Sequence, residues 1–183
     1  METFDLAGRW QEIVCMIPTY LPDIGNCSEL WLSGGAKMQQ PVKVESLLKA
    51  LAKVFALDLT TLKQIQKQIL KKGKLVPLPI ISRLVLIPVK VRNQMLPGDG
   101  TIGYVAYRFV AGFEPINEED FKSSIALENG QTLKTFHTAR TLDERTHQAE
   151  IVLQHYKQLY QLPTRDSGSD CHNFNCPFMK NNN

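Results

Sequence analysis

The most apolar stretch of the chain, residues 75–91, is interrupted by three prolines and two basic residues. A helix that crosses a bilayer needs about 20 uninterrupted apolar residues, and this stretch does not supply them. We therefore expect no membrane span, and we predict an extended segment over Arg83–Val91. The interrupting residues are Pro77, Pro79, Arg83, Pro88 and Lys90.

Composition places the chain among ordinary soluble globular proteins, since 43% of its 183 residues are hydrophobic and 21% are charged. A chain of this length buries about 70% of the surface that its unfolded form exposes, so it needs neither a disulfide nor a metal to hold a core. The first residues include Glu2, Asp5, Arg9 and Glu12 rather than the basic start and long apolar run of a secretory signal. We expect a cytoplasmic protein.

Charge is distributed unevenly along the chain. Residues 37–92 hold twelve bases and two acids, a net charge of +10, whereas the whole chain has a net charge of +3. A concentrated positive field attracts a polyanion, and neutralised phosphates supply most non-specific affinity for nucleic acids. The alternative is that the lysines only keep the outer faces of helices soluble. The near absence of compensating acids favours a polyanionic partner.

Partly alternating apolar residues predict strands over Gln11–Ile17 and Glu29–Leu32, with a third over Met38–Val44. From Glu45 onward the apolar residues recur at helical spacing, which predicts an amphipathic helix. The first part of the chain therefore changes from strands to helix.

A second helix is predicted from the capping-box pattern of Thr61 and Gln64, and Gly73 lies where a helix C-cap is expected. Its polar side carries three lysines at four-residue spacing. Like charges at this spacing weaken an isolated helix by a few tenths of a kcal/mol per pair, and a bound anion would relieve the repulsion. The three lysines are Lys63, Lys67 and Lys71.

The sequence predicts further strands between residues 83 and 136. Extended segments are predicted over Arg83–Val91 and Gly103–Phe113. Asn129-Gly130 separates two apolar runs, Ile125–Leu127 and Thr132–Phe136, and Asn-Gly in such a place is a strong β-hairpin signal.

A last helix is predicted to open with a capping box of Thr141 and Glu144 and to run to about Gln161. The segregated runs of strands and helices indicate an α+β fold, with a mostly antiparallel sheet, a two-helix insertion and a C-terminal helix. We expect a single DNA-binding domain over residues 1–162 and a flexible polar tail over residues 163–183.

The four cysteines do not form the pattern of a metal site. Cys171 and Cys176 are separated by four residues, His172 among them, and Cys15 and Cys27 would have to supply further ligands from the other end of the chain. Paired cysteines of structural zinc sites lie about two to four residues apart, a spacing that the second pair does not match. We expect no metal, with Cys15 in the core and the tail thiols free and reduced.

No pattern of catalytic residues is present in the sequence. The four histidines are scattered, and the chain lacks the nucleophile-elbow, zinc-protease, phosphate-loop and dinucleotide-binding motifs. We therefore expect no enzyme activity, no catalytic residue and no cofactor.

Two helices with a short connection over residues 46–71 are compatible with a helix-turn-helix, but the second has no arginine on its polar side. Its lysines would contact phosphates, which position a protein without reading bases. Base discrimination would come from Gln66, Arg83 or Arg92, or from the width of an A·T-rich minor groove. The predicted DNA-binding residues are Lys63, Lys67, Lys71, Lys72, Lys74, Arg83, Lys90 and Arg92.

The order of several short motifs resembles the ComK family of competence transcription factors over roughly residues 40–160. A proline-rich strand precedes an Ile87-Pro88 dipeptide, Tyr104 follows a glycine where the family usually has tryptophan, and an Asn-Gly hairpin precedes a helix. Each motif is common by itself, so the ordered set carries the resemblance. The motifs are Val76-Pro77-Leu78-Pro79-Ile80-Ile81, Leu86-Ile87-Pro88, Ile102-Gly103-Tyr104-Val105, Leu127-Glu128-Asn129-Gly130-Gln131-Thr132-Leu133 and the Thr141 helix.

The resemblance implies a transcriptional activator that binds paired A·T-rich boxes of double-stranded DNA, largely through the minor groove and as a homo-oligomer, in a Gram-positive cytoplasm. It also implies delivery to a Clp protease by an adaptor that grips an apolar segment near the C-terminus, which Pro177-Phe178-Met179 resembles faintly. One alternative is a non-catalytic interaction or adaptor module whose basic segment docks an acidic protein, with Phe174, Phe178 and Met179 as a disordered linear motif. A small enzyme using Cys171 or a histidine is the third alternative.

Overall fold

The computed structural model describes residues 3–162 except Asp23, Gly73 and Glu119. Within this part of the chain, nine strands form two antiparallel sheets. The strands are β1 (Ile13–Leu21), β2 (Gly25–Leu32), β3 (Lys37–Gln40), β4 (Leu78–Ile81), β5 (Leu84–Lys90), β6 (Ile102–Ala106), β7 (Val110–Glu118), β8 (Phe121–Leu127) and β9 (Thr132–Thr135). The helices are α1 (Leu6–Arg9), α2 (Val44–Val54), α3 (Leu59–Leu70) and α4 (Ala139–Leu159), with 3-10 turns at Trp10–Glu12 and Tyr107–Phe109.

The predicted α+β class is confirmed. A six-stranded sheet has the order β3-β2-β1-β6-β5-β4, a three-stranded sheet has the order β7-β8-β9, and every pair of neighbours is antiparallel. Two helices, α2 and α3, lie between β3 and β4 in the sequence, and α4 follows the last strand. None of the helices in the described residues combines the length and the apolar character that crossing a membrane requires.

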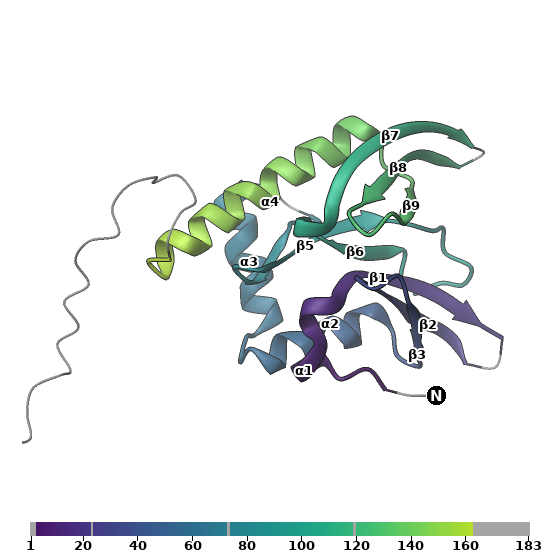
Figure 1. Ribbon diagram of the computed structural model, residues 1–183, viewed down its shortest axis with the longest axis horizontal. Helices are drawn as coiled ribbons and strands as arrows, with labels where there is room; N and C mark the ends of the chain where they lie inside the picture. Colours follow the sequence, from purple (N-terminus) through teal and green to yellow (C-terminus); the bar gives the residue numbers. More distant parts are fainter. Residues whose placement is uncertain (1–2, 23, 73, 119, 163–183) are drawn as a thin grey trace, which may run out of the picture.

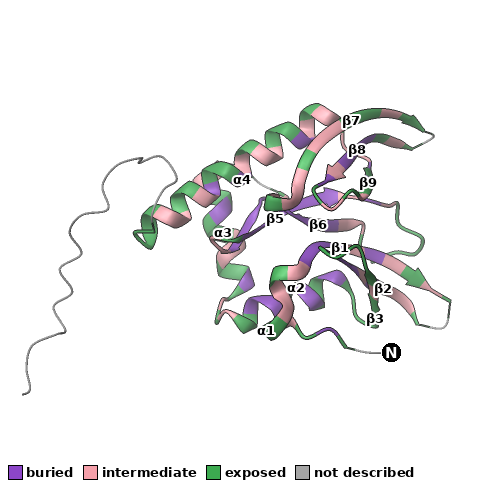
Figure 2. Cartoon of the chain, viewed as in Figure 1, coloured by how far each residue is buried: buried purple, intermediate pink, exposed green. Residues whose placement is uncertain are grey.

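The six-stranded sheet is the middle of three layers (Figure 1). Helices α1 and α2 cover one face, and α4 with the three-stranded sheet covers the other. Helix α3 lies beside the edge strand β4 and contacts both that strand and α4. The buried residues therefore run along the middle strands and the inner sides of the covering elements (Figure 2).

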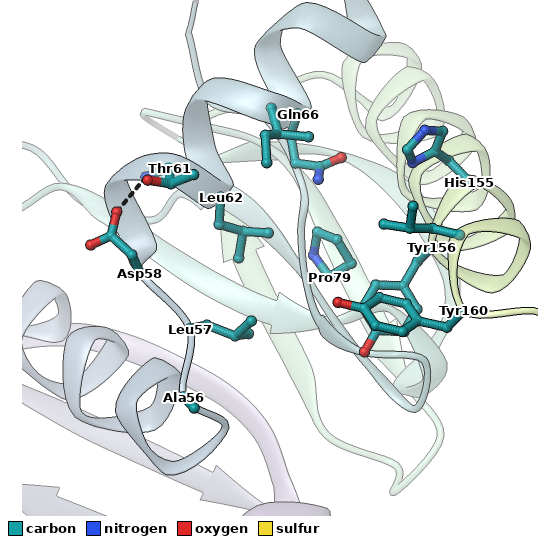
Figure 3. Close-up of a pocket in the computed structure, with 12 residues that line it drawn as sticks. Ala56, Leu57, Asp58, Thr61, Leu62, Gln66, Pro79, His155, Tyr156 and Tyr160 are labelled. Carbon is teal, nitrogen blue, oxygen red and sulfur yellow. Dashed lines mark hydrogen bonds between the residues drawn. The ribbon is translucent and has the colours of Figure 1, made fainter.

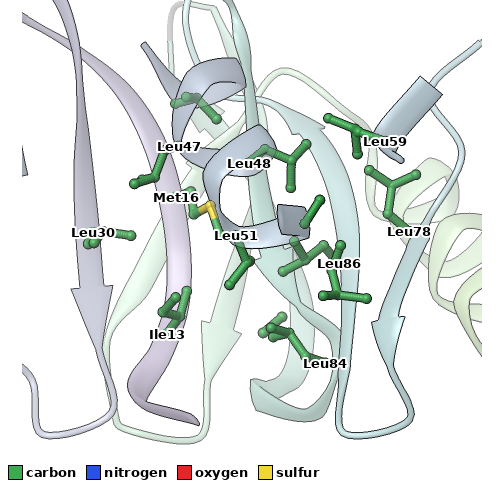
Figure 4. Packing of buried hydrophobic residues seen from close by; sticks show 14 of the residues in the cluster. Ile13, Met16, Leu30, Leu47, Leu48, Leu51, Leu59, Leu78, Leu84 and Leu86 are labelled. Atoms are coloured by element: carbon green, nitrogen blue, oxygen red, sulfur yellow. The ribbon is translucent and has the colours of Figure 1, made fainter. Parts of the chain in front are cut away.

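Two apolar clusters hold these layers together. On one face, Leu48 and Leu51 of α2 pack against sheet residues such as Ile13 and Leu86 (Figure 4). On the other face, Val89 belongs to a cluster that includes residues of β8, β9 and α4. Burial of a Leu or Val side chain contributes about 1.5–3 kcal/mol, so the two clusters supply most of the drive to fold.

A β-bulge adapts β1 to these two clusters. The register with β2 shifts between Ile13 and Cys15, which leaves Val14 as the extra residue. Val14 and Cys15 then both belong to the cluster beneath α4, although consecutive strand residues normally point to opposite faces.

The prolines of the apolar strands occupy edge positions. Pro79 and Pro115 are in the edge strands β4 and β7. Pro18 lies beyond the stretch of β1 that pairs with β6, and Pro88 lies beyond the stretch of β5 that pairs with β4. Proline has no N–H to donate to a ladder, so these positions tolerate it and the proline-rich run can still form strands.

Two predicted strands differ from the structure. The strand predicted over Met38–Val44 is only β3, which ends at Gln40, and Val44 begins α2. The segment Gly103–Phe113 is not continuous, because the turn Tyr107–Phe109 divides it into β6 and β7. Strand β6 pairs with β1 and β5, whereas β7 pairs with β8 in the other sheet. The turn therefore carries the chain from the middle layer into the outer one.

The caps of the two long helices also differ from the predicted capping boxes. The carboxylate of Asp58 caps α3 and accepts a 2.7 Å hydrogen bond from the Thr61 N–H, so Thr61 lies inside the first turn. Likewise Thr138 caps α4 and accepts from the Thr141 N–H at 3.2 Å. The predicted C-cap Gly73 lies outside the described residues. The Asn129-Gly130 hairpin between β8 and β9 is confirmed, with φ of 80° at Gly130.

Leu48→Ala tests the packing of α2 on the sheet. The Leu48 side chain is fully buried, so we expect this change to lower the free energy of unfolding by about 3 kcal/mol, measured by urea denaturation. Val54→Ala on the same helix is the control, because Val54 is exposed and its truncation should change stability by less than about 0.5 kcal/mol. Equal losses in the two variants would contradict this account of the core.

His137 makes the stability of the outer layer depend on pH. Burial, followed by the charges of Arg145, Lys90 and Lys122, lowers the pKa of His137 from 6.5 to about 4. The unfolded chain therefore binds a proton that the folded chain rejects between these values. The contribution of His137 to the free energy of unfolding should therefore be fully present above pH 6.5 and should be lost as the pH falls toward 4.

The variant His137→Gln isolates this effect from the titration of carboxylates. We expect it to flatten the pH dependence of the urea midpoint between pH 6.5 and 4 relative to the parent chain. His147→Gln replaces an exposed histidine of α4 and serves as the control for removing a histidine elsewhere. A parental profile in His137→Gln would show that His137 does not titrate as described.

Candidate nucleic-acid interface

Helix α3 presents two faces to its surroundings. The helix has about 3.6 residues per turn, which places Lys63 and Lys67 on one face and Ile65 on another. Lys63 and Lys67 line a groove of about 450 Å³, and Lys74 joins them from the segment that follows the helix. Three of the predicted DNA-binding lysines therefore meet around one groove.

The floor of the groove is apolar. Leu75 and Val76 come from the segment between α3 and β4, Pro88 from β5, and Ile102 and Tyr104 from β6. Tyr104 lies directly opposite Pro88 in the β5–β6 pair, so the two side chains share one face of the sheet. The groove thus combines an apolar floor with cationic walls.

One carboxylate stands beside these cations. The Lys63 Nζ atom is 3.8 Å from Oε1 of Glu45, which lies in the first turn of α2 and whose side chain is 66% exposed. Burial, with a smaller contribution from the Glu45 charge, raises the pKa of the Tyr104 hydroxyl to about 12, so this hydroxyl stays neutral. Among the eight predicted DNA-binding residues, only Lys63 forms an ion pair within the described part of the chain. The cationic character of the groove is therefore largely uncompensated.

Arg145 of α4 fixes the wall that carries Lys74. Its Nη1 atom donates to the backbone oxygen of Pro88 at 2.7 Å and to that of Leu75 at 3.2 Å. Leu75 has a φ of 51°, in the left-handed region that costs a non-glycine residue of order 1 kcal/mol or more. Burial lowers the pKa of Arg145, and the two carbonyl oxygens compensate part of its lost hydration.

The other predicted lysines of this region lie past the groove. Lys71 caps the C-terminus of α3 in a left-handed conformation, and both Lys71 and Lys72 are exposed. Cations near a helix C-terminus are favoured by the helix dipole. These two lysines extend the positive surface beyond Lys67.

Arg83 does not line the groove. It is exposed in the turn between β4 and β5, and its charge lowers the pKa of Arg108, whose burial is the larger cause. The guanidinium of Arg108 lies over the Phe109 ring at 4.7 Å and donates to the backbone oxygen of Gln11. A second basic patch, Arg83 with Arg108, therefore lies at the start of β5, and sequence reasoning did not include Arg108.

Lys90 and Arg92 lie at the opposite end of β5. Lys90 Nζ donates to Asn93 Oδ1 at 3.0 Å and lies over the ring of Phe136 at 4.8 Å. The Arg92 side chain donates to the Gly100 backbone oxygen at 2.8 Å and to Asn26 Oδ1 at 2.7 Å. With a rise of about 3.3 Å per residue, a strand separates Arg83 from Lys90 by roughly 23 Å. The structure does not bring these three residues together.

The cysteines that the structure describes are not arranged for metal binding. Cys15 and Cys27 are buried free thiols, and burial raises the pKa of both. The described residues contain no group of three or more histidine, cysteine, aspartate or glutamate side chains placed to hold a metal ion. The tail residues Cys171, His172 and Cys176 lie outside the described residues.

Comparison with known proteins finds no relative: no protein-family model, no curated protein and no solved structure matches this chain. Support for a function therefore comes from the geometry and charge of the groove.

Glu45→Gln tests the electrostatics of the groove. The change removes the carboxylate beside Lys63, so we expect sodium tripolyphosphate, a compact polyanion, to bind about two- to fivefold more tightly at low salt. Isothermal titration calorimetry measures the affinity, and the difference should shrink at about 1 M salt, where charges are screened within roughly 3 Å. The control Glu128→Gln removes an exposed carboxylate from the β8–β9 hairpin instead. Equal effects of the two changes, or weaker binding to Glu45→Gln, would contradict a polyanion site here.

Proposed function

We propose that this chain is a DNA-binding transcription regulator similar to the ComK family. In this proposal the chain binds A·T-rich double-stranded DNA through its lysine-lined groove. One observation carries the proposal: Lys63, Lys67 and Lys74 converge on one groove, and only Lys63 has an ion-pair partner in the described residues. Polyphosphate binding relieves the mutual repulsion of such cations and releases counterions from the DNA. The same proposal places the protein in the cytoplasm and assigns it to the regulation of competence.

The lysines and arginines have different roles in this proposal. Lys63 and Lys67 contact phosphates of one strand, since their positions are separated by only about 6 Å along the helix axis. Lys74 contacts the same backbone from the segment that follows α3, and the exposed Lys71 and Lys72 extend the positive surface. Such contacts position a protein on DNA and carry no sequence information.

Sequence preference is assigned to the arginine at the start of β5. Arg83 is exposed, and arginine inserts readily into the narrow, strongly negative minor groove of A·T-rich DNA. Lys90 and Arg92 lie at the end of β5 nearer the groove, which Pro88 and Ile102 line, and Lys90 is opposite Ile102 in the β5–β6 pair. Arg83 and this end of the strand contact DNA together only if the duplex runs along β5 or a second copy of the chain presents Arg83. The separation of roughly 23 Å along β5 therefore favours the proposed homo-oligomer on paired boxes.

A second candidate function is docking of an acidic protein segment. The apolar floor formed by Ile102 and Tyr104 favours it, because a peptide with acidic and apolar side chains would contact both floor and lysines, whereas phosphates would contact only the lysines. Within either function, a Clp-protease adaptor would be a further partner that acts on the chain near its C-terminus.

The triple variant Lys63→Gln, Lys67→Gln, Lys74→Gln tests DNA binding at the groove. We expect weaker binding to every duplex, with the slope of log affinity against log salt reduced by about 0.9 for each phosphate that the variant no longer neutralises. Fluorescence anisotropy with a labelled A·T-rich duplex at several salt concentrations measures both quantities. A parent chain that shows no binding at low salt would overturn the proposal.

A matched control removes the same charge elsewhere. Lys49→Gln, Lys53→Gln, Lys122→Gln replaces exposed lysines of α2 and β8, which do not line the groove. Equal decreases in affinity for the two triple variants would mean that net charge alone holds DNA.

Two further ligands test sequence preference and the alternative function. A duplex rich in G·C should bind the parent chain more weakly than the A·T-rich duplex. An acidic peptide that outcompetes the A·T-rich duplex would favour the docking function instead.

A further inference from the structure

Helices α3 and α4 enclose a separate pocket of about 230 Å³ at the edge strand β4 (Figure 3). Its walls are mostly apolar, with Leu62 and Ile65 on α3, Pro79 on β4 and Leu159 on α4. Leu159 is 67% exposed although it lines the pocket, so the pocket is open to solvent beside the end of α4. An apolar ligand can enter there without unfolding the protein.

A buried amide inside this pocket lacks a partner. Gln66 is only 4% exposed, its side chain projects from α3 toward α4, and its Oε1 atom accepts no hydrogen bond within the described residues (Figure 3). By contrast, the equally buried Gln40 accepts from the Phe4 N–H at 3.1 Å and donates to the Gln39 backbone oxygen at 3.0 Å. An unpaired buried acceptor costs about 1–3 kcal/mol, so Gln66 is a ready acceptor for a ligand that brings a donor.

The size and the aromatic wall of the pocket define the shape of such a ligand. A cavity of about 150 Å³ holds benzene, and a pocket of 230 Å³ has room for a second fused ring. The rings of Tyr156 and Tyr160 lie 4.6 Å apart in a tilted arrangement and line the α4 side. Aromatic side chains contact flat rings favourably in stacked or edge-on geometries.

The polar groups at the rim favour a neutral ligand. The Asp58 carboxylate already caps α3 through its hydrogen bond with the Thr61 N–H, and His155 is exposed on α4. No other titratable acid or base with a formal charge lines the pocket among the described residues. A charged ligand would lose its hydration in this pocket without gaining a buried partner of opposite charge.

We propose that the pocket between α3 and α4 binds a small, neutral, bicyclic aromatic molecule whose single N–H or O–H donates to Gln66 Oε1. This site lies on α3 away from Lys63 and Lys67, and nothing in its geometry requires the chain to bind DNA. The proposal therefore stands or fails independently of the DNA-binding function.

Two isosteric probes test the hydrogen bond in the full chain. Indole carries an N–H donor, and benzofuran has the same shape with an oxygen in place of that N–H. We expect indole to bind with a dissociation constant on the order of 0.1–1 mM, as befits nine heavy atoms, and benzofuran to bind about tenfold more weakly. Isothermal titration calorimetry measures both, and failure of indole to bind, or equal affinities for the two probes, overturns the proposal.

Gln66→Met removes the acceptor and keeps a side chain of similar length. We expect this variant to bind indole and benzofuran with equal affinity, because the amide oxygen no longer distinguishes them. Gln68→Met changes an exposed glutamine of the same helix and should retain the preference for indole. A preference that survives in Gln66→Met would overturn the assigned contact.

If Gln66→Met does not fold, NMR spectroscopy of the unmutated chain with indole tests whether the ligand occupies this pocket. Intermolecular nuclear Overhauser effects should connect indole protons with the methyl groups of Leu62 and Leu159. Contacts with methyl groups elsewhere, or none with these two, would show that indole does not occupy this pocket and would overturn the proposal.

Discussion

Burial of the central sheet on both faces is the constraint on which the rest of this structure depends. Leu86 points into the cluster beneath α2, and its neighbour Ile87 points into the cluster beneath α4. A sheet that is apolar on both sides needs a covering layer on each. The chain supplies α2 for one side and the three-stranded sheet with α4 for the other, which leaves the edge strand β4 to be closed by α3.

Local signals predicted the elements well, and non-local pairing explains where they failed. The Asn129-Gly130 hairpin and the amphipathic helices are encoded within a few residues, through positive φ at a turn and helical spacing of apolar side chains. By contrast, Pro18 is compatible with β1 because the pairing of β1 with β6 stops at Met16, and a single sequence does not contain that information. The break at Tyr107–Phe109 is equally non-local, since it depends on which sheet each half joins.

The groove could be predicted only in part, because some of its residues come together through local spacing and others through non-local packing. Lys63 and Lys67 share a helix face at a spacing that the sequence displays, whereas Glu45 and Tyr104 join them only through tertiary packing and the register of β6 on β5. The grouping of Arg83 with Lys90 overlooked the length of an extended strand, which alone separates them by roughly 23 Å. Periodicity therefore locates residues within one element and says little about the distances between elements.

The groove and the pocket lie on opposite sides of β4 because adjacent strand residues point to opposite faces. Leu78 lines the groove and Pro79 lines the pocket, while α3 forms a wall of both. Helix α4 also serves both, through Tyr156 in the pocket and through Arg145, which holds the Leu75 backbone at the groove. Helix α3 is therefore the element that the groove and the pocket share, with Lys63 and Lys67 on one of its faces and Ile65 and Gln66 on another.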